Sequence, residues 1–103
     1  MLVEKLKIDF KTLMNELKEE PLNKMKGTVA IHSVNLIDNG EYIEFELKTF
    51  GIDEEIKDEY REITLMTLLC RHKEFILNAI AIKLLKLKYD LNKKLKEIEK
   101  NEN

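Results

Sequence analysis

The chain has 103 residues, of which 44% are hydrophobic and 37% charged, and its formal net charge is −2. This balance favours one soluble globular domain over residues 1–103 and excludes an intrinsically disordered chain. The single cysteine, Cys70, excludes an internal disulfide and favours a reducing compartment. The most apolar stretch, residues 75–87, contains two lysines and is shorter than the roughly 20 residues of a membrane span. The first ten residues do not resemble a signal peptide, so we expect a cytoplasmic protein without membrane contact.

The N-terminal segment has apolar residues at helical spacing. These residues follow one another at intervals of three and four, which predicts one face of a helix over residues 2–17. Pro21 ends the predicted helix, because the residue before a proline avoids the α region. Residues 21–27 then form a connector. The apolar face consists of Val3, Leu6, Phe10, Leu13 and Leu17.

Residues 28–50 read as a β-hairpin around Asn39-Gly40. Both residues tolerate positive φ, which a two-residue type I′ turn requires. That turn predicts one face that pairs Leu36 with Ile43, Val34 with Phe45, His32 with Leu47, and Ala30 with Thr49. The other face pairs Ile37 with Tyr42, Asn35 with Glu44, Ser33 with Glu46, and Val29 with Phe50. A three-residue loop would set apolar residues against charged ones, so the two-residue turn is preferred.

The segment after the hairpin is predicted to be helical. Gly51 closes the second strand, and Asp53 is the expected N-cap of a helix that begins at residue 54. Apolar spacing continues through Ile56, Tyr60, Ile63 and Thr67. A single helix over residues 54–99 would be roughly 69 Å long, so we predict a break near residues 71–74. An unbroken helix stays open as an alternative for a coiled-coil oligomer.

The last helix, from about residue 74 to 99, is apolar on two sides. Its second side contains Phe75, Ala79, Ile82, Leu85 and Tyr89. One short helix and one hairpin cannot cover both sides, so we expect self-association into a dimer or a higher oligomer. Residues 99–103 are expected to be a frayed tail. The predicted oligomerisation face, here called the leucine seam, comprises Leu77, Ile80, Leu84, Leu87, Leu91, Leu95 and Ile98.

Charge is divided unevenly along the chain. Residues 41–62 contain nine acids against three bases, and residues 71–96 contain eight bases against two acids. The two segments can pair within or between subunits, or the basic helix can meet an anionic partner. The acidic face is a solvated helix side or a docking face for a partner protein, and it comprises Glu54, Glu55, Asp58, Glu59 and Glu62. The candidate anion-binding set comprises Arg71, His72, Lys73, Lys83 and Lys86.

The sequence contains no recognisable catalytic motif. It lacks a glycine-rich phosphate loop, a nucleophile elbow and a paired Cys/His zinc pattern, so we expect no enzyme, no cofactor and no metal. His32 is predicted to face the core as a satisfied histidine, with ligand binding or proton transfer as the alternative. Cys70 is predicted to be a small buried residue. Arginine occurs only twice, which argues against nucleic-acid binding.

These observations predict an α+β fold: an N-terminal helix, a two-stranded antiparallel hairpin, and one or two C-terminal helices. The function we expect is that of a small non-enzymatic, homo-oligomeric protein that binds a partner protein. The alternative is an oligomeric binder of an anionic small molecule, nucleotide or nucleic acid at a basic site between subunits. The chain contains 16 Lys, 11 Ile and 8 Asn, whose codons are AT-rich. Small size and this compositional bias are in the style of phage or plasmid accessory proteins, some of which block a host protein.

Overall fold

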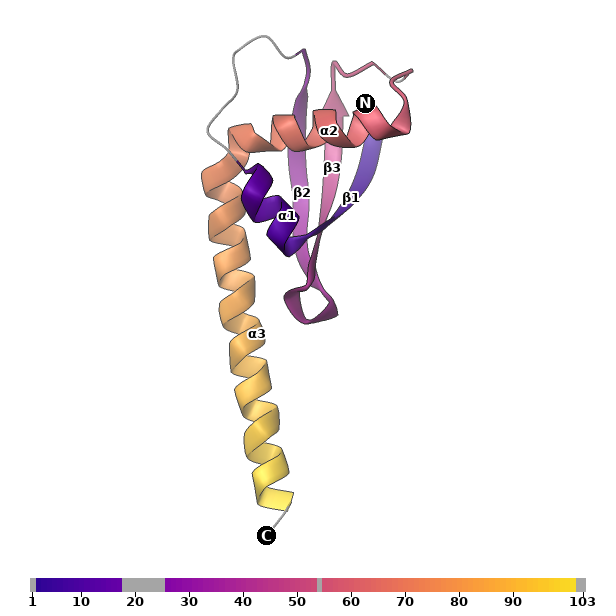
Figure 1. The fold of residues 1–103 in the computed structure, drawn as a ribbon. Coiled ribbons are helices and arrows are strands. Elements are labelled where there is room, and N and C mark those ends of the chain that lie inside the picture. Colours follow the sequence, from indigo (N-terminus) through magenta and orange to yellow (C-terminus); the bar gives the residue numbers. More distant parts are fainter. Residues whose placement is uncertain (1, 18–25, 54, 102–103) are drawn as a thin grey trace.

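A computed structural model describes residues 2–17, 26–53 and 55–101 of the chain. The fold is α+β, with a three-stranded antiparallel sheet of order β1-β3-β2 and a long C-terminal helix (Figure 1). The strands are β1 (Leu2–Asp9), β2 (Thr28–Ile37) and β3 (Tyr42–Phe50). The helices are α1 (Phe10–Glu16), α2 (Asp58–Leu69) and α3 (Lys73–Asn101).

The N-terminal segment is a strand followed by a short helix, so the predicted helix over residues 2–17 is wrong in its first half. β1 pairs with β3 and sets Leu6 against Phe45, which makes the sheet three-stranded instead of two-stranded. β1 supplies hydrogen-bond partners to the backbone groups along one edge of β3. Helical spacing within the N-terminal segment does not reveal this stabilising contact with a distant strand. Asp9 then caps α1, because its side chain accepts a hydrogen bond from the Thr12 amide at 3.1 Å.

Asn39 and Gly40 form the predicted type I′ turn, but the loop spans four residues and not two, because Asp38 also has positive φ (54°) and Glu41 is in the α region. Asn39 has φ 57° and ψ 30°, Gly40 has φ 91°, and the Glu41 amide donates to the Asp38 carbonyl at 3.2 Å. The predicted pairs next to the turn are also confirmed, including Leu36 with Ile43. On the opposite face, Ser33 pairs with Glu46 and Asn35 with Glu44, as expected from the two-residue turn.

A β-bulge at His32 overturns the predicted register in the first half of β2. The ladder runs from Ser33 opposite Glu46 directly to Ile31 opposite Leu47, which leaves His32 as an extra residue. The bulge turns Val29 onto the covered face, where it is 2% exposed and lies opposite Thr49. The predicted pairs of His32 with Leu47, Ala30 with Thr49 and Val29 with Phe50 are therefore wrong.

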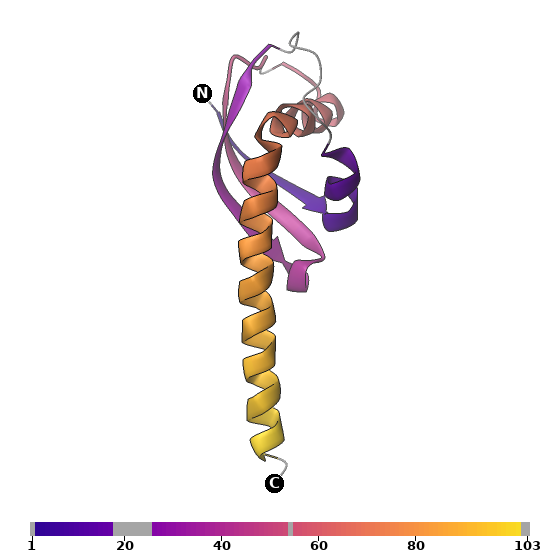
Figure 2. The same cartoon turned by 90° about the vertical axis from the view of Figure 1, so that its left-hand side faces the viewer.

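The core lies between one face of the sheet and the helices α1 and α2 (Figure 2). α2 buries one side against the sheet. Ile63, which belongs to the predicted apolar spacing, instead points outward and is 64% exposed. The helix begins at Asp58, later than expected: the Asp53 carboxylate caps a separate turn by accepting from the Glu55 amide at 2.9 Å. The largest fully buried side chains are Phe45, Leu13, Ile43, Leu47, Leu68, Leu69 and Ile76.

The predicted break between the two C-terminal helices is confirmed. A 3-10 turn over Cys70–His72 separates α2 from α3. α3 then runs beside β2 and projects past the end of the sheet (Figures 1 and 2). It continues through Asn101, beyond the expected start of the tail at residue 99. The Pro21 connector lies almost wholly outside the described residues.

Candidate functional site

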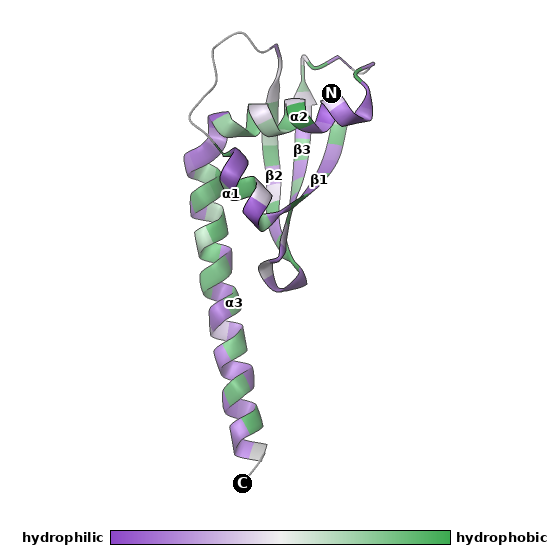
Figure 3. Cartoon of the chain, viewed as in Figure 1, coloured by the Kyte–Doolittle hydropathy of each residue, from purple (hydrophilic) through white to green (hydrophobic). Residues whose placement is uncertain are grey.

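α3 is the candidate functional site because, among the described residues, it carries most of the exposed large hydrophobic side chains. Its 29 residues include neither Gly nor Pro and are rich in Leu and Lys, which favour helix throughout its length. Hydrophobic residues recur along the whole helix, including the part that extends beyond the sheet (Figure 3). A domain that packs against one side of such a helix leaves apolar surface open on the others.

The globular part of the chain covers only the first half of α3. Ile76 and Ile80 are 0% and 3% exposed, and they anchor the helix in the core. Further along α3, Leu84 and Leu87 lie close to Gly40 in the hairpin turn. A Cβ placed on Gly40 would lie 3.7 Å from a methyl group of each. From residue 88 to residue 100 every side chain of α3 is exposed. The chain's own core therefore ends about halfway along the helix.

The structure divides the leucine seam into a covered and an uncovered part. Ile80 is buried and Leu87 is half-buried, whereas Leu77 and Leu84 are 37% and 38% exposed. In the uncovered part, exposure rises to between 45% and 56%. Its members stay on one side of the helix, so they form a continuous apolar strip. That uncovered strip consists of Leu91, Leu95 and Ile98.

The predicted second apolar side of α3 is also largely open. Ala79 is half-buried and packs against the core, but the other members do not. Contiguous exposed apolar surface on this scale is typical of an interaction site. The open side chains, 57% to 68% exposed, are Phe75, Ile82, Leu85 and Tyr89.

The acidic face lies around the N-terminal end of α2. Glu55 precedes the helix, whereas Asp58, Glu59 and Glu62 belong to its first two turns, and all four are exposed. Glu54, the fifth predicted member, lies outside the described residues. Neither described ion pair, Lys5–Glu46 nor Arg61–Glu4, joins this face to the lysines of α3. The four described side chains therefore carry negative charge that is exposed to solvent.

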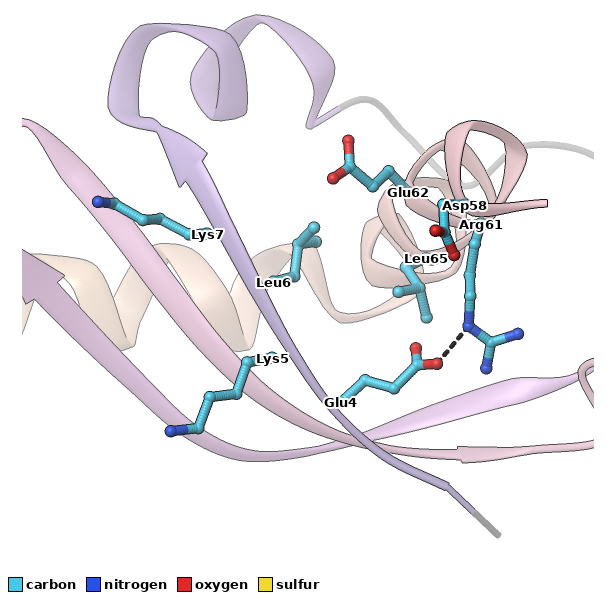
Figure 4. A pocket seen from close by; sticks show the side chains of 8 residues that line it. All are labelled: Glu4, Lys5, Leu6, Lys7, Asp58, Arg61, Glu62 and Leu65. Atoms are coloured by element: carbon cyan, nitrogen blue, oxygen red, sulfur yellow. Dashed lines mark hydrogen bonds and ion pairs between the residues drawn. The ribbon is translucent and has the colours of Figure 1, made fainter. Parts of the chain in front are cut away.

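A cleft between β1 and α2 contains a charged pair that sequence reasoning missed. Arg61 Nε donates to Glu4 Oε1 across the cleft (Figure 4). Arg61 Nη1 also donates to the Asp53 carbonyl at 3.1 Å. The two side chains are 12% and 18% exposed, respectively. The cleft has a volume of about 550 Å³, and Asp58 and Glu62 of the acidic face line its α2 side.

The Glu4–Arg61 pair joins β1 to α2 and leaves little net charge in the cleft. Two of its atoms, Glu4 Oε2 and Arg61 Nη2, are buried without a hydrogen-bond partner among the described residues. The residues are 57 positions apart, so no local motif could have revealed them. The one sequence signal for the position of Glu4 is the alternation of side chains along β1, which places Glu4 on the same face of the sheet as Leu6.

The candidate anion-binding set is not gathered in one place within a single copy. Arg71 Nη1 donates to the Gly27 carbonyl at 2.9 Å, which ties the junction of α2 and α3 to the start of β2. His72 and Lys73 are half-buried at the same junction. Lys83 lies about 15 Å further along α3 than Lys73, and Lys86 further still. A basic site shared between subunits stays a prediction.

His32 is exposed, so the prediction that it faces the core is wrong. As the extra residue of the bulge, it points to the rim of a shallow groove of about 280 Å³ between β2 and α3, which Phe75 and Lys83 also line. Cys70 is 7% exposed, which confirms that it is a small buried residue. Its thiol lies 3.4 Å from the carbonyls of Glu16 and Met66.

Across the described parts of the chain, no three His, Cys, Asp or Glu side chains come together in a way that could hold a metal ion. Within residues 2–17, 26–53 and 55–101, no helix combines the length and apolar character that a bilayer crossing requires. Comparison with protein-family models, with curated proteins and with solved structures found no match for the chain.

Proposed function

We propose that this chain is a non-enzymatic interaction protein that assembles with a second copy of itself through the leucine seam of α3. The observation that supports the proposal is the uncovered second half of the helix. Leu91, Leu95 and Ile98 are between 45% and 56% exposed, and no residue of α3 from 88 to 100 is buried. Burial of such side chains is the main driving force for helix association in water.

A second copy is the occupant that fits this surface best. The seam repeats at intervals of three and four residues, which is the spacing of a helix that packs against another helix. An isologous dimer uses the same patch on both chains, so each seam covers the other. The strip lies beyond the sheet, where the chain's own helices α1 and α2 leave room for a second helix (Figure 1).

The assembled protein is proposed to bind a partner protein in the cytoplasm through its acidic face. Asp58, Glu59 and Glu62 are exposed on α2, away from the uncovered half of α3, so self-association leaves them accessible. A basic protein surface has the complementary chemistry. Neutralising the three side chains together to Asn, Gln and Gln should abolish capture of that partner while leaving the dimer intact. Capture that persists would contradict this part of the proposal.

Light scattering on purified protein tests the assembly. The unmodified chain should have the mass of a dimer or higher oligomer at micromolar concentration. The double variant Leu91→Gln/Leu95→Gln should be a folded monomer, because polar side chains at these positions remove the gain from burial. Lys93→Gln, which changes an exposed residue on the opposite side of the same helix, is the matched control and should leave the mass unchanged. An unmodified chain that is monomeric at high micromolar concentration would overturn the proposal.

A further inference from the structure

We infer that two copies of α3 pair antiparallel, with Leu91 at the two-fold axis. This inference rests on the self-association proposed above and adds its direction and register. The partner is a second copy of this chain, and the contact covers the helix from about residue 81 to its end. Two observations carry the inference: the spacing of the seam, and the charges along one of its edges.

The seam has the same spacing in both directions from Leu91. Leu87 and Leu95 lie four residues away on either side, and Leu84 and Ile98 lie seven residues away. A two-fold axis through Leu91 therefore places Leu84 against the second copy's Ile98 and Leu87 against its Leu95. Each apolar side chain of the seam from Leu84 to Ile98 therefore lies at the same height along the axis as an apolar side chain of the second copy.

The charged residues beside the seam favour the same direction. Lys83, Asp90, Lys94 and Glu97 flank one edge, and in an antiparallel pair the same edges of both helices face each other. Lys83 then lies within about 3 Å along the axis of the second copy's Glu97. Asp90 lies equally close to the second copy's Lys94 and to its Asp90, so its contacts favour neither direction, and the Lys83–Glu97 pair carries the charge preference. In a parallel pair, Lys83 would instead face Lys88 of the second copy, a pairing of like charges.

The position of the globular part is compatible with this arrangement. The sheet and α2 lie at the N-terminal end of α3, so an antiparallel pair places the two globular parts at opposite ends (Figure 1). A parallel pair would bring both to one end, around Leu77 and Leu84. Leu84 keeps 38% of its exposure beside the hairpin turn, which leaves it accessible to the end of the second helix.

Site-directed crosslinking tests the direction and the register. Single cysteines are placed in a Cys70→Ala background and treated with a short bismaleimide, and products are identified by mass. Leu91→Cys should link to itself. Leu84→Cys and Ile98→Cys should each link poorly alone and efficiently when mixed. Lys93→Cys, on the opposite side of the helix, is the control and should not link.

The outcomes separate this inference from the proposed function. Self-linking by Leu84→Cys as efficient as that by Leu91→Cys would overturn the antiparallel direction while leaving self-association in place. A dimer that links neither at residue 91 nor in the mixture would overturn the register. A monomer by light scattering, with no linking at any position, would overturn the proposed function itself.

A charge exchange supplies a second measurement that does not depend on crosslinking. Lys83→Glu should weaken the antiparallel dimer about three- to tenfold in Kd, because it faces Glu97 twice per dimer. The combined Lys83→Glu/Glu97→Lys variant should restore the original Kd. Tighter association of the Lys83→Glu variant would overturn the inference, because that is the result expected when residue 83 faces Lys88.

Discussion

At the residue scale, the Glu4–Arg61 pair is the contact with the clearest energetic consequence. Glu4→Gln removes the anion that faces a largely enclosed guanidinium, and a buried cation without its partner is costly. We expect this variant to lose about 1–3 kcal/mol of unfolding free energy. Urea unfolding followed by circular dichroism measures the change. The matched control is Lys5→Gln, because the Lys5–Glu46 pair is 4.0 Å long and Lys5 is 67% exposed.

The control variant should change stability by less than about 1 kcal/mol, the usual value of an exposed ion pair. A double variant with Leu at position 4 and Met at position 61 should recover much of the loss, since an apolar pair avoids the desolvation of two charges. If Glu4→Gln and Lys5→Gln were equally stable, the pair would have no special role in joining β1 to α2.

At the element scale, two glycines with positive φ differ in their surroundings. Gly40 has φ 91°, and an added Cβ would meet only ordinary contacts, with Leu84 and Leu87 of α3. Gly27 has φ 102°, and an added Cβ would lie 2.7 Å from Ile52 Cγ1 and 3.1 Å from the Phe50 carbonyl oxygen. Gly40→Ala should therefore cost about 1 kcal/mol, from backbone strain alone. Gly27→Ala should cost more, because strain and overlap add.

Thermal unfolding of the two glycine variants checks this order. A larger decrease in Tm for Gly40→Ala than for Gly27→Ala would contradict it. The comparison also tests whether the start of β2 is held rigidly, since the Gly27 carbonyl accepts the hydrogen bond from Arg71.

Elements defined by local chemistry were predictable from the sequence. The Asn39-Gly40 turn needs only its own two residues, and it sets the register of the adjacent pairs. The exposed seam of α3 was also predictable, because it follows from counting apolar residues around one helix. Its occupant is not predictable in this way, since any apolar surface of matching shape could cover it.

Elements that depend on distant contacts were not predictable. Leu6 fits both the helical spacing with Leu13 and the alternation of a strand, and only pairing with β3 decides between them. The bulge at His32 leaves no pattern in the neighbouring residues, although it moves Val29 from one face of the sheet to the other. The Glu4–Arg61 pair joins two elements whose proximity the sequence does not indicate.

At the scale of the whole molecule, α3 makes the chain elongated. The principal extents are 61, 24 and 20 Å, and the radius of gyration is 17.0 Å. A compact chain of this length would have a radius of gyration of about 13 Å. The difference reflects a helix whose second half lies outside the core.

Amide hydrogen exchange along α3 should report this division. In the Leu91→Gln/Leu95→Gln variant, amides near Ile76 and Ile80 should exchange slowly, whereas those after residue 88 should exchange quickly because no packing supports that end. In the unmodified chain, self-association should slow exchange over residues 88–98 by at least tenfold. Equal exchange rates in the two proteins over this range would show that the seam is not covered.

Because α3 is packed in the core only near its N-terminal end, a small change of its angle there moves its C-terminal end by a much larger distance. Ile98 lies about 33 Å along the helix from Ile76, so a tilt of about 10° at the anchor moves the far end by roughly 6 Å. The helix has no Gly or Pro at which it could bend to absorb such a movement. A force or a bound molecule at its tip is therefore transmitted to the packing of Ile76 and Ile80 beneath the sheet.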